Sequence, residues 1–251
     1  SASAQAPDSW TQKASLPFLS ERERGVGMAV NGKGYVGTGF NSALGYLSGW
    51  WEYDPTSDNW NQKTDFQWAA RSRMVGWALN GKCYMGTGYD NNAPYFTGWF
   101  QYDPSADTWT QKGNFHNPFG DSPRSGSSGF TINGKGYVAC GWNGSTEYND
   151  LWEYNPATDT WTQKANYGGV GRYSGVGFSI GNYVYVGTGF DGTAYRKDFW
   201  KYNPLANTWE KIADYPFLRA LSSAFVIGNK GYVVAGSDAT ANSAYTQLYE
   251  Y

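Results

Sequence analysis

The chain has 251 residues, a formal net charge of −2 and a pI near 5.4, so its overall charge gives no reason to expect a nucleic-acid partner. It contains no uninterrupted apolar run of about 18 residues, the length of a membrane-spanning helix, so we expect no membrane span. Aromatic residues make up 19% of the chain and 33 residues are glycine, which favours a single all-β domain of short, tightly turned strands.

A unit of roughly 50 residues repeats five times along the chain. Its first landmark is a tyrosine in a glycine-rich segment such as GYVGTG, and these tyrosines are Tyr35, Tyr84, Tyr137, Tyr185 and Tyr232. An aromatic-x-Tyr-[Asp/Asn]-Pro segment follows in four repeats, beginning at Trp51, Phe100, Trp152 and Trp200. A tryptophan that opens a polar segment is the third landmark, at Trp10, Trp60, Trp109, Trp161 and Trp209.

Each repeat is predicted to form four short strands. In the first repeat, residues 25–30 form strand one, Asn31-Gly32 is a two-residue hairpin turn, and residues 35–40 form strand two. Residues 51–53 form strand three, an Asp-Pro turn follows, and strand four begins at Trp60. Four antiparallel strands in a repeat of this length predict one blade of a β-propeller.

The two ends of the chain are predicted to meet in the fifth blade. We place the blades in one domain, at about residues 17–63, 64–112, 113–164, 165–213 and 214–251. The last repeat stops at the end of its third strand, and residues 7–13 align with the fourth strand of the first repeat, which contains Trp60. We therefore expect the N-terminal strand to complete the C-terminal blade and close the ring, which removes the exposed sheet edges.

The three landmarks together resemble the kelch-repeat family, and the resemblance covers essentially the whole chain. It implies a five-bladed kelch-type β-propeller, which has fewer blades than is usual in that family. Only the second glycine of the family's double glycine is kept, as in Thr38-Gly39. The phrases GKGYVGTG and WEYDPTSDNWNQK look like secreted or surface kelch proteins of bacteria, which implies an extracytoplasmic location. The small, polar first residues, SASAQA, are compatible with the remnant of a secretory signal.

Arginines recur at two positions where the innermost strand of a blade begins. Thirteen residues before each landmark tyrosine stand Arg22, Arg71, Arg124, Arg172 and Arg219, and eleven residues before it stand Arg24 and Arg73. One interpretation is that the guanidinium groups bond backbone carbonyls of neighbouring loops. The other is ligand binding: in kelch domains that capture acidic peptides, arginines at similar positions bind the ligand. The resemblance thus implies a carboxylate-binding patch beside blades one and two.

Aromatic and polar residues follow the retained glycine in four blades. The aromatic residues are Phe40, Tyr89, Trp142 and Phe190, and the polar residues directly after them are Asn41, Asp90, Asn143 and Asp191. Aromatic faces beside amide and carboxylate groups suit a sugar, whose C–H faces stack on the rings while its hydroxyls are hydrogen-bonded. Alternatively, the aromatic ring packs on the next blade and the polar residue closes the turn.

The sequence offers little for catalysis. The single histidine, His116, and two cysteines in different repeats, Cys83 and Cys140, make no zinc or copper centre of ordinary ligands, and we expect no metal and no cofactor. The five predicted innermost strands contain no Asp or Glu, which disfavours a glycosidase. We interpret both cysteines as small buried hydrophobic residues.

These patterns predict a non-catalytic binding module. A monomer would use the mouth of the central channel, with its arginines and aromatic loops, to hold a glycan or an acidic peptide or protein segment. Two alternatives stay open. One is a sugar enzyme like the kelch-type sialic acid mutarotases, which would use arginine for the carboxylate and a loop carboxylate as the base. The other is a structural scaffold within a surface assembly.

Overall fold

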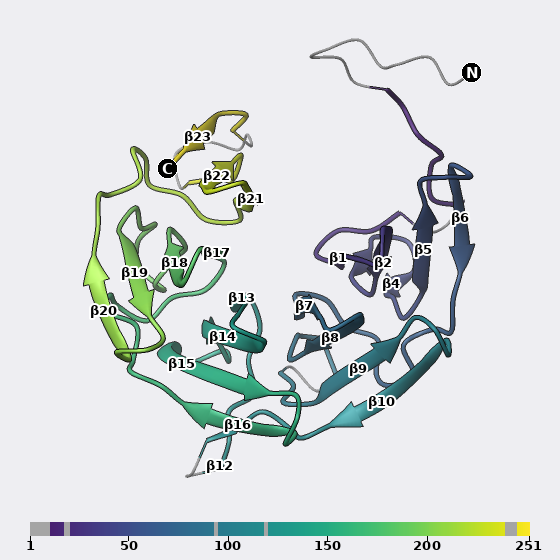
Figure 1. The fold of residues 1–251 in the computed structure, drawn as a ribbon, viewed down its shortest axis with the longest axis horizontal. Helices are drawn as coiled ribbons and strands as arrows, with labels where there is room; N and C mark the ends of the chain where they lie inside the picture. Colours follow the sequence, from purple (N-terminus) through teal and green to yellow (C-terminus); the bar gives the residue numbers. More distant parts are fainter. Residues whose placement is uncertain (1–10, 18–20, 93–94, 118–119, 239–244) are drawn as a thin grey trace.

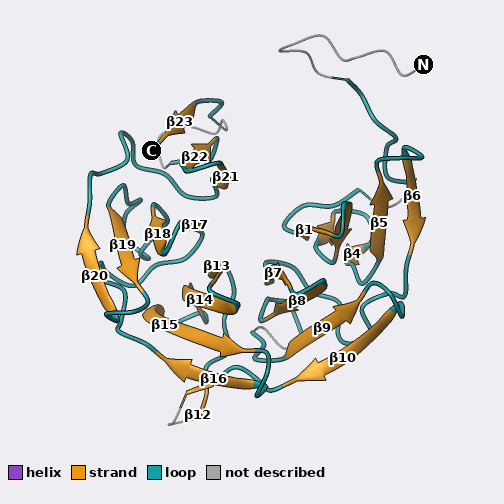
Figure 2. Cartoon of the chain, viewed as in Figure 1, coloured by secondary structure: helices purple, strands orange, loops and turns teal. Residues whose placement is uncertain are grey.

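The computed structural model describes residues 11–17, 21–92, 95–117, 120–238 and 245–251. Five antiparallel sheets lie around a common axis with their first strands innermost, so the predicted five-bladed propeller is confirmed (Figures 1 and 2). No helix occurs in these residues, and none of them could therefore span a membrane as a helix.

Four of the five blades have four strands each. Blade one contains β1 (Val26–Val30), β2 (Lys33–Gly37), β5 (Trp50–Asp54) and β6 (Asn59–Gln62). Blade two contains β7 (Val75–Leu79), β8 (Lys82–Gly86), β9 (Trp99–Asp103) and β10 (Thr108–Lys112). Blade three contains β13 (Ser128–Ile132), β14 (Lys135–Trp142), β15 (Glu147–Asn155) and β16 (Thr160–Gln163). Blade four contains β17 (Val176–Ile180), β18 (Tyr183–Gly187), β19 (Phe199–Asn203) and β20 (Thr208–Lys211).

Blade five has three strands in the described part of the chain: β21 (Ser223–Ile227), β22 (Lys230–Val234) and β23 (Leu248–Glu250). Of the predicted closing strand, residues 7–10 lie outside the described residues, and residues 11–13 belong to no strand and are exposed. The predicted closure of the ring by this strand is therefore not seen in the described residues. Two short ladders, β3 (Phe40–Asn41) with β4 (Gly45–Tyr46) and β11 (His116–Asn117) with β12 (Gly120–Asp121), lie outside the blades.

Asn-Gly turns fix the register of the inner hairpins. Asn31 and Gly32 have φ of 51° and 77°, the left-handed pair that a type I′ turn requires, and Val30 is paired with Lys33 across the turn. Asn80 and Gly81 repeat this geometry in blade two, with φ of 51° and 73°. The predicted two-residue hairpins are thus built by the residues that tolerate this backbone best.

The hydrophobic core lies between the blades, where large aromatic side chains of adjacent sheets interlock. The ring of Trp109 in blade two lies 5.3 Å from that of Trp50 in blade one and 5.5 Å from that of Phe66 in the connecting segment. Cys83 and Cys140 are free and buried, as expected, and burial raises the pKa of each thiol to about 12. Packing between blades, more than within them, therefore makes the sheets one unit.

Trp99 offers a test of this inter-blade packing. Its side chain is fully buried, and its ring contacts Trp77 within blade two and Trp161 of blade three. We expect Trp99→Ala to lower the free energy of unfolding by about 3–5 kcal/mol, measured by denaturant titration. Its indole N–H has no hydrogen-bond partner among the described residues, so Trp99→Phe should cost much less. Equal losses for the two variants would contradict this packing role.

Candidate functional site

Four of the predicted ligand-binding arginines are buried. Arg71, Arg124, Arg172 and Arg219 are between 0% and 3% exposed. Their Nη1 groups donate to nearby carbonyls, for example that of Arg124 to the Cys140 oxygen at 3.0 Å and that of Arg172 to the Thr188 oxygen at 3.0 Å. Arg22 is half-buried and repeats this arrangement, donating to the Thr38 and Gly49 oxygens at 3.1 and 2.9 Å.

Carboxylates and aromatic rings complete the surroundings of these arginines. Arg172 forms a bidentate ion pair with Asp198, in which both hydrogen bonds are 2.9 Å long. Arg124 forms a bidentate ion pair with Asp150 in the same way. Burial alone would raise the pKa of the Asp198 carboxyl, but the hydrogen bonds and charge of Arg172 hold it below its ordinary value. The guanidinium of Arg124 also lies 3.9 Å from the ring centroid of Tyr148.

The five arginines of this series are therefore structural residues of the loops that precede the innermost strands. Their burial and their bonds to carbonyls and carboxylates leave Arg71, Arg124, Arg172 and Arg219 out of reach of a ligand, which corrects the expectation that they bind one. Arg22 holds its own two carbonyls in the same way. The first of the two interpretations of this series is the one that the geometry supports.

The four polar residues that follow the retained glycines also serve the framework. The Asn41 side-chain oxygen accepts from the Ala43 and Leu44 amides at 2.8 and 3.0 Å, and Asp191 accepts from Thr193 and Ala194 in the same way. Asp90 and Asn143 close their turns likewise, through the amides of Asn92 and Ser145. Because these oxygens already hold turns, we remove Asn41, Asp90, Asn143 and Asp191 from the ligand-binding set.

The aromatic residues of these loops form one continuous arc of rings, which we call the aromatic arc. Successive centroids are 4.9 to 6.1 Å apart from Phe40 in blade one to Tyr195 in blade four. All of its members are half-buried, so each presents part of a ring to solvent. In order, they are Phe40, Tyr46, Tyr89, Tyr95, Trp142, Tyr173, Phe190 and Tyr195.

Arg24 and Arg73 differ from the buried arginines, because their side chains are at the surface. The Arg24 side chain is 46% exposed and lies 3.4 Å from the carboxylate of Glu23, an exposed pair that offsets little of its charge. Arg73 is half-buried, and no hydrogen bond or ion pair of its guanidinium occurs among the described residues. Both residues have left-handed backbone, with φ of 56° and 55°.

A backbone hydrogen-bond chain holds these two arginines at the channel mouth. The amide of Arg73 donates to the Arg24 oxygen at 2.9 Å, and that of Gly126 donates to the Arg73 oxygen at 3.3 Å. Ser174 and Leu221 continue the chain in blades four and five. Only the first two blades have a cation at this position, so the positive charge is confined to one side of the mouth.

The two arginines and the start of the aromatic arc line one pocket of about 460 Å³. Asn91 lies within it and accepts from the hydroxyls of Tyr46 and Tyr89 at 3.1 and 3.0 Å. The predicted ligand-binding set includes neither Asn91 nor Tyr173, because neither stands at a position that repeats in every blade. The lining residues are Arg24, Phe40, Tyr46, Arg73, Tyr89, Asn91, Tyr95 and Trp142.

Comparison with known proteins agrees with the sequence repeats. Residues 116–236 match the family model described as "KLHDC2/KLHL20/DRC7 Kelch-repeats domain". The fold is similar to the solved structure titled "Structure of YjhT", with a TM-score of 0.82 and 18% sequence identity over 98% of this chain and 86% of that chain. No curated protein matches the sequence significantly.

The pair of Arg172 and Asp198 gives the framework a measurable pH dependence. A lowered carboxyl pKa stabilises the fold fully above the unfolded value of about 4, and this contribution is lost as pH falls through the folded value. We expect Asp198→Asn to lower the free energy of unfolding by about 3–5 kcal/mol at pH 7, because it leaves Arg172 buried without a counter-charge.

The difference between Asp198→Asn and the unchanged protein should shrink as the pH is lowered below about 4, measured by urea unfolding across pH. Asp214→Asn is the control, since that carboxylate is 37% exposed in its ion pair with Lys211. A pH-independent difference, or an equal loss in the control, would contradict the assignment.

Proposed function

Because the chain folds as a five-bladed β-propeller and matches a kelch-repeat model over residues 116–236, we propose that it is a non-catalytic binding module that holds a carboxylate-bearing glycan at the mouth of its channel. The observation that carries this proposal is the pocket in which Arg24 and Arg73 stand beside the first five rings of the aromatic arc. Kelch propellers commonly serve in binding, and the finer assignment of the ligand rests on the chemistry of this pocket.

The two arginines support an anionic ligand. Arg24 is exposed and Arg73 half-buried at the channel mouth, and the bond between the Arg73 amide and the Arg24 oxygen holds them on adjacent blades. They also border a second pocket of about 580 Å³ at the channel mouth, and residues of all five blades line this pocket. A carboxylate above this point meets two guanidinium groups, each able to make charge-assisted hydrogen bonds.

The rings and Asn91 support a sugar as the body of that ligand. Partly exposed faces of Tyr89, Tyr95 and Trp142 suit the C–H faces of pyranose rings, and the Asn91 amide lies among them. An acidic peptide shares the carboxylate but places less flat C–H surface against the rings. We therefore favour the glycan and treat the peptide as the rival.

The pocket also supports binding without chemistry. The described residues that line it include no carboxylate and no imidazole, the usual proton-transfer groups. Burial raises the pKa of the Tyr46 and Tyr95 hydroxyls, while the charge of Arg73, joined at Tyr46 by that of Arg24, acts in the opposite direction. These hydroxyls therefore stay protonated at neutral pH and are poor bases.

Replacing the two arginines tests the proposal. Serine is the substitute of choice, because Ser174 takes the equivalent position of blade four with φ of 56°. We expect Arg24→Ser with Arg73→Ser to weaken the binding of uronic-acid oligosaccharides at least about 100-fold, measured by calorimetry, since two charge-assisted bonds are lost. The melting temperature should not fall.

The control is Lys33→Ala with Lys82→Ala, which removes two charges at the opposite ends of the inner hairpins of the same blades. Unchanged affinity in the serine variant, or equal affinity for neutral and acidic oligosaccharides, would overturn the proposal. Tighter binding of acidic peptides than of any oligosaccharide would favour the rival.

A further inference from the structure

Blade four has a pocket of its own, separate from the channel mouth. Its volume is about 530 Å³, and it shares no lining residue with the pocket of Arg24 and Arg73. Tyr195, the last ring of the aromatic arc, borders it. We call it the blade-four pocket, and its walls include Gly168, Gly169, Arg196, Lys197, Trp200 and Lys211.

In two other blades, a ring from the connecting segment covers an aromatic residue of the third strand. Trp68 stands two residues after Phe66 in the segment before blade two, and its ring centroid lies 4.1 Å from that of Phe100 on β9. Phe217 takes the equivalent position before blade five and lies 5.7 Å from the ring of Tyr249 on β23. The covered Phe100 is only 2% exposed.

Blade four has two glycines in place of this covering ring. Gly168-Gly169 stands at the position of Gln67-Trp68, because the two connecting segments have the same length between their aromatic residue and their arginine. A Cβ atom at Gly168 would lie 2.3 Å from the ring of Trp200, so only glycine lets the backbone pass this close to the ring. Trp200, the counterpart of Phe100, is half-buried. The pocket therefore opens over a ring that is covered in blade two.

Three cations line this pocket at positions where other blades have none. Lys211 stands where blades one to three have glutamine, at Gln62, Gln111 and Gln163. Arg196-Lys197 stands where the other four blades have uncharged pairs, which are Leu47-Ser48, Phe96-Thr97, Tyr148-Asn149 and Tyr245-Thr246. The propeller repeat does not require a charge at these positions, and all three departures from it meet in one pocket.

Ion pairs already hold some of the charged groups in this pocket. The Asp198 carboxylate accepts from the indole N–H of Trp200 at 2.8 Å, in addition to its bidentate pair with Arg172. Arg196 is held from outside the pocket lining, since its Nε donates to Asp191 at 2.6 Å. These groups therefore shape the pocket more than they charge it.

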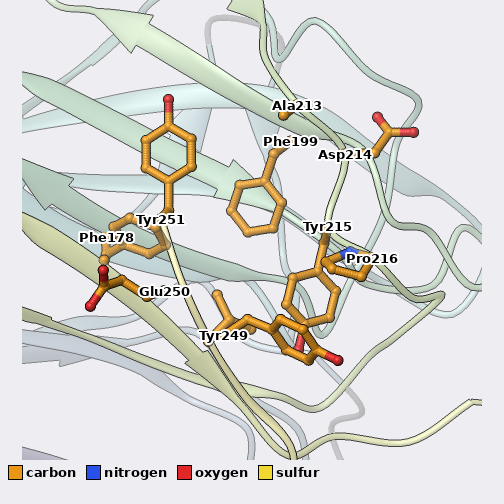
Figure 3. A pocket seen from close by; sticks show the side chains of 11 residues that line it. Phe178, Phe199, Ala213, Asp214, Tyr215, Pro216, Tyr249, Glu250 and Tyr251 are labelled. Atoms are coloured by element: carbon orange, nitrogen blue, oxygen red, sulfur yellow. The ribbon is translucent and has the colours of Figure 1, made fainter.

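Lys197 and Lys211 share the one carboxylate of Asp214. Their Nζ atoms lie 3.9 and 3.5 Å from its two oxygens, and their side chains are 48% and 55% exposed. Figure 3 shows the Asp214 carboxylate pointing away from the rings of Phe199 and Tyr215, which line the adjacent pocket of about 220 Å³. Two ammonium groups against one carboxylate leave a net positive charge, and because both flank the same group, they can contact one bound anion together.

We propose that the blade-four pocket binds a sulfate or phosphate ester carried on a sugar ring. A lysine ammonium acts as a point charge that suits a tetrahedral oxyanion, whereas the planar fork of arginine suits a carboxylate. The exposed part of Trp200 offers a stacking surface for the sugar ring. Val170 and Leu218, each 49% exposed, extend the apolar surface beside it. This site does not depend on the carboxylate site at the channel mouth.

Replacing the two lysines by the residues of blade two tests the site. We expect Lys197→Thr with Lys211→Gln to weaken the binding of glucose 6-sulfate and glucose 6-phosphate about 30-fold, measured by calorimetry, because two charge-assisted contacts are lost. The melting temperature should change by less than about 2 °C, since exposed ion pairs stabilise a fold little. Binding of either ester by the unchanged protein supports the site, and its source, a sulfated or a phosphorylated sugar, is the ester that binds more tightly.

The control is Lys63→Gln with Lys112→Gln, which removes the same charge from blades one and two. These lysines also face aspartates, at 3.6 Å from Asp107 and 3.4 Å from Asp159. The control should bind both esters as the unchanged protein does. An equal loss in the two double variants, or no binding of either ester by the unchanged protein, would overturn the proposal.

The protein with Arg24→Ser and Arg73→Ser separates this site from the channel mouth. We expect it to bind the two esters with unchanged affinity and to bind glucuronic acid far more weakly, because the blade-four pocket prefers a tetrahedral oxyanion. Loss of ester binding in this variant would place the ester at the channel mouth and overturn the proposal. Equal affinity for inorganic sulfate or phosphate and for the sugar esters would overturn the role of Trp200. None of these outcomes tests the uronic-acid oligosaccharides of the proposed function, so the two proposals can fail separately.

Discussion

A buried arginine at the loop face joins the blades of this propeller. The side chain of Arg124 serves its own blade, where it bonds the Cys140 carbonyl and pairs with Asp150, while its backbone carbonyl accepts from the Gly88 amide of the preceding blade at 2.8 Å. Arg172 and Arg219 make the same backbone link with Gly141 and Gly189, at 2.8 and 2.6 Å. Burying a guanidinium is costly unless its donors are satisfied, and here carbonyls, carboxylates and ring faces together offset that cost.

At the channel mouth, the repeated framework leaves a surface cation only at positions that depart from the repeat. A residue present in every blade, such as the buried arginine or the turn-closing Asn and Asp, is occupied by the fold wherever it recurs. Arg24 and Arg73 occur in two blades only, and the equivalent residues Gly126, Ser174 and Leu221 carry no charge. Their left-handed backbone recurs at Gly126, Ser174 and Leu221, so the conformation belongs to the framework and only the charged side chain departs from it. The two arginines that break the repeat therefore support a binding site on blades one and two.

Most of the architecture could be predicted from the sequence, because a propeller is specified by local signals repeated in phase. The Asn31-Gly32 turn and the landmark tyrosines carry enough information to place each strand. The site could be predicted only in part. The sequence pattern placed the buried Arg124 and the exposed Arg24 in one ligand-binding set, since both come shortly before an innermost strand, and their difference in burial is seen only in the structure. Asn91 and Tyr173 are missing from the predicted ligand-binding set because their role arises from contacts between loops of different blades.

The backbone hydrogen-bond chain at the channel mouth bears on this site through geometry. Arg24 is the first residue of the backbone chain that continues through Arg73, Gly126 and Ser174 to Leu221. A linear chain of such bonds leaves its first member held from one side, whereas a closed ring holds every member from both. Arg24 is linked to this chain through its carbonyl, and it is also the more exposed of the two cations at the channel mouth.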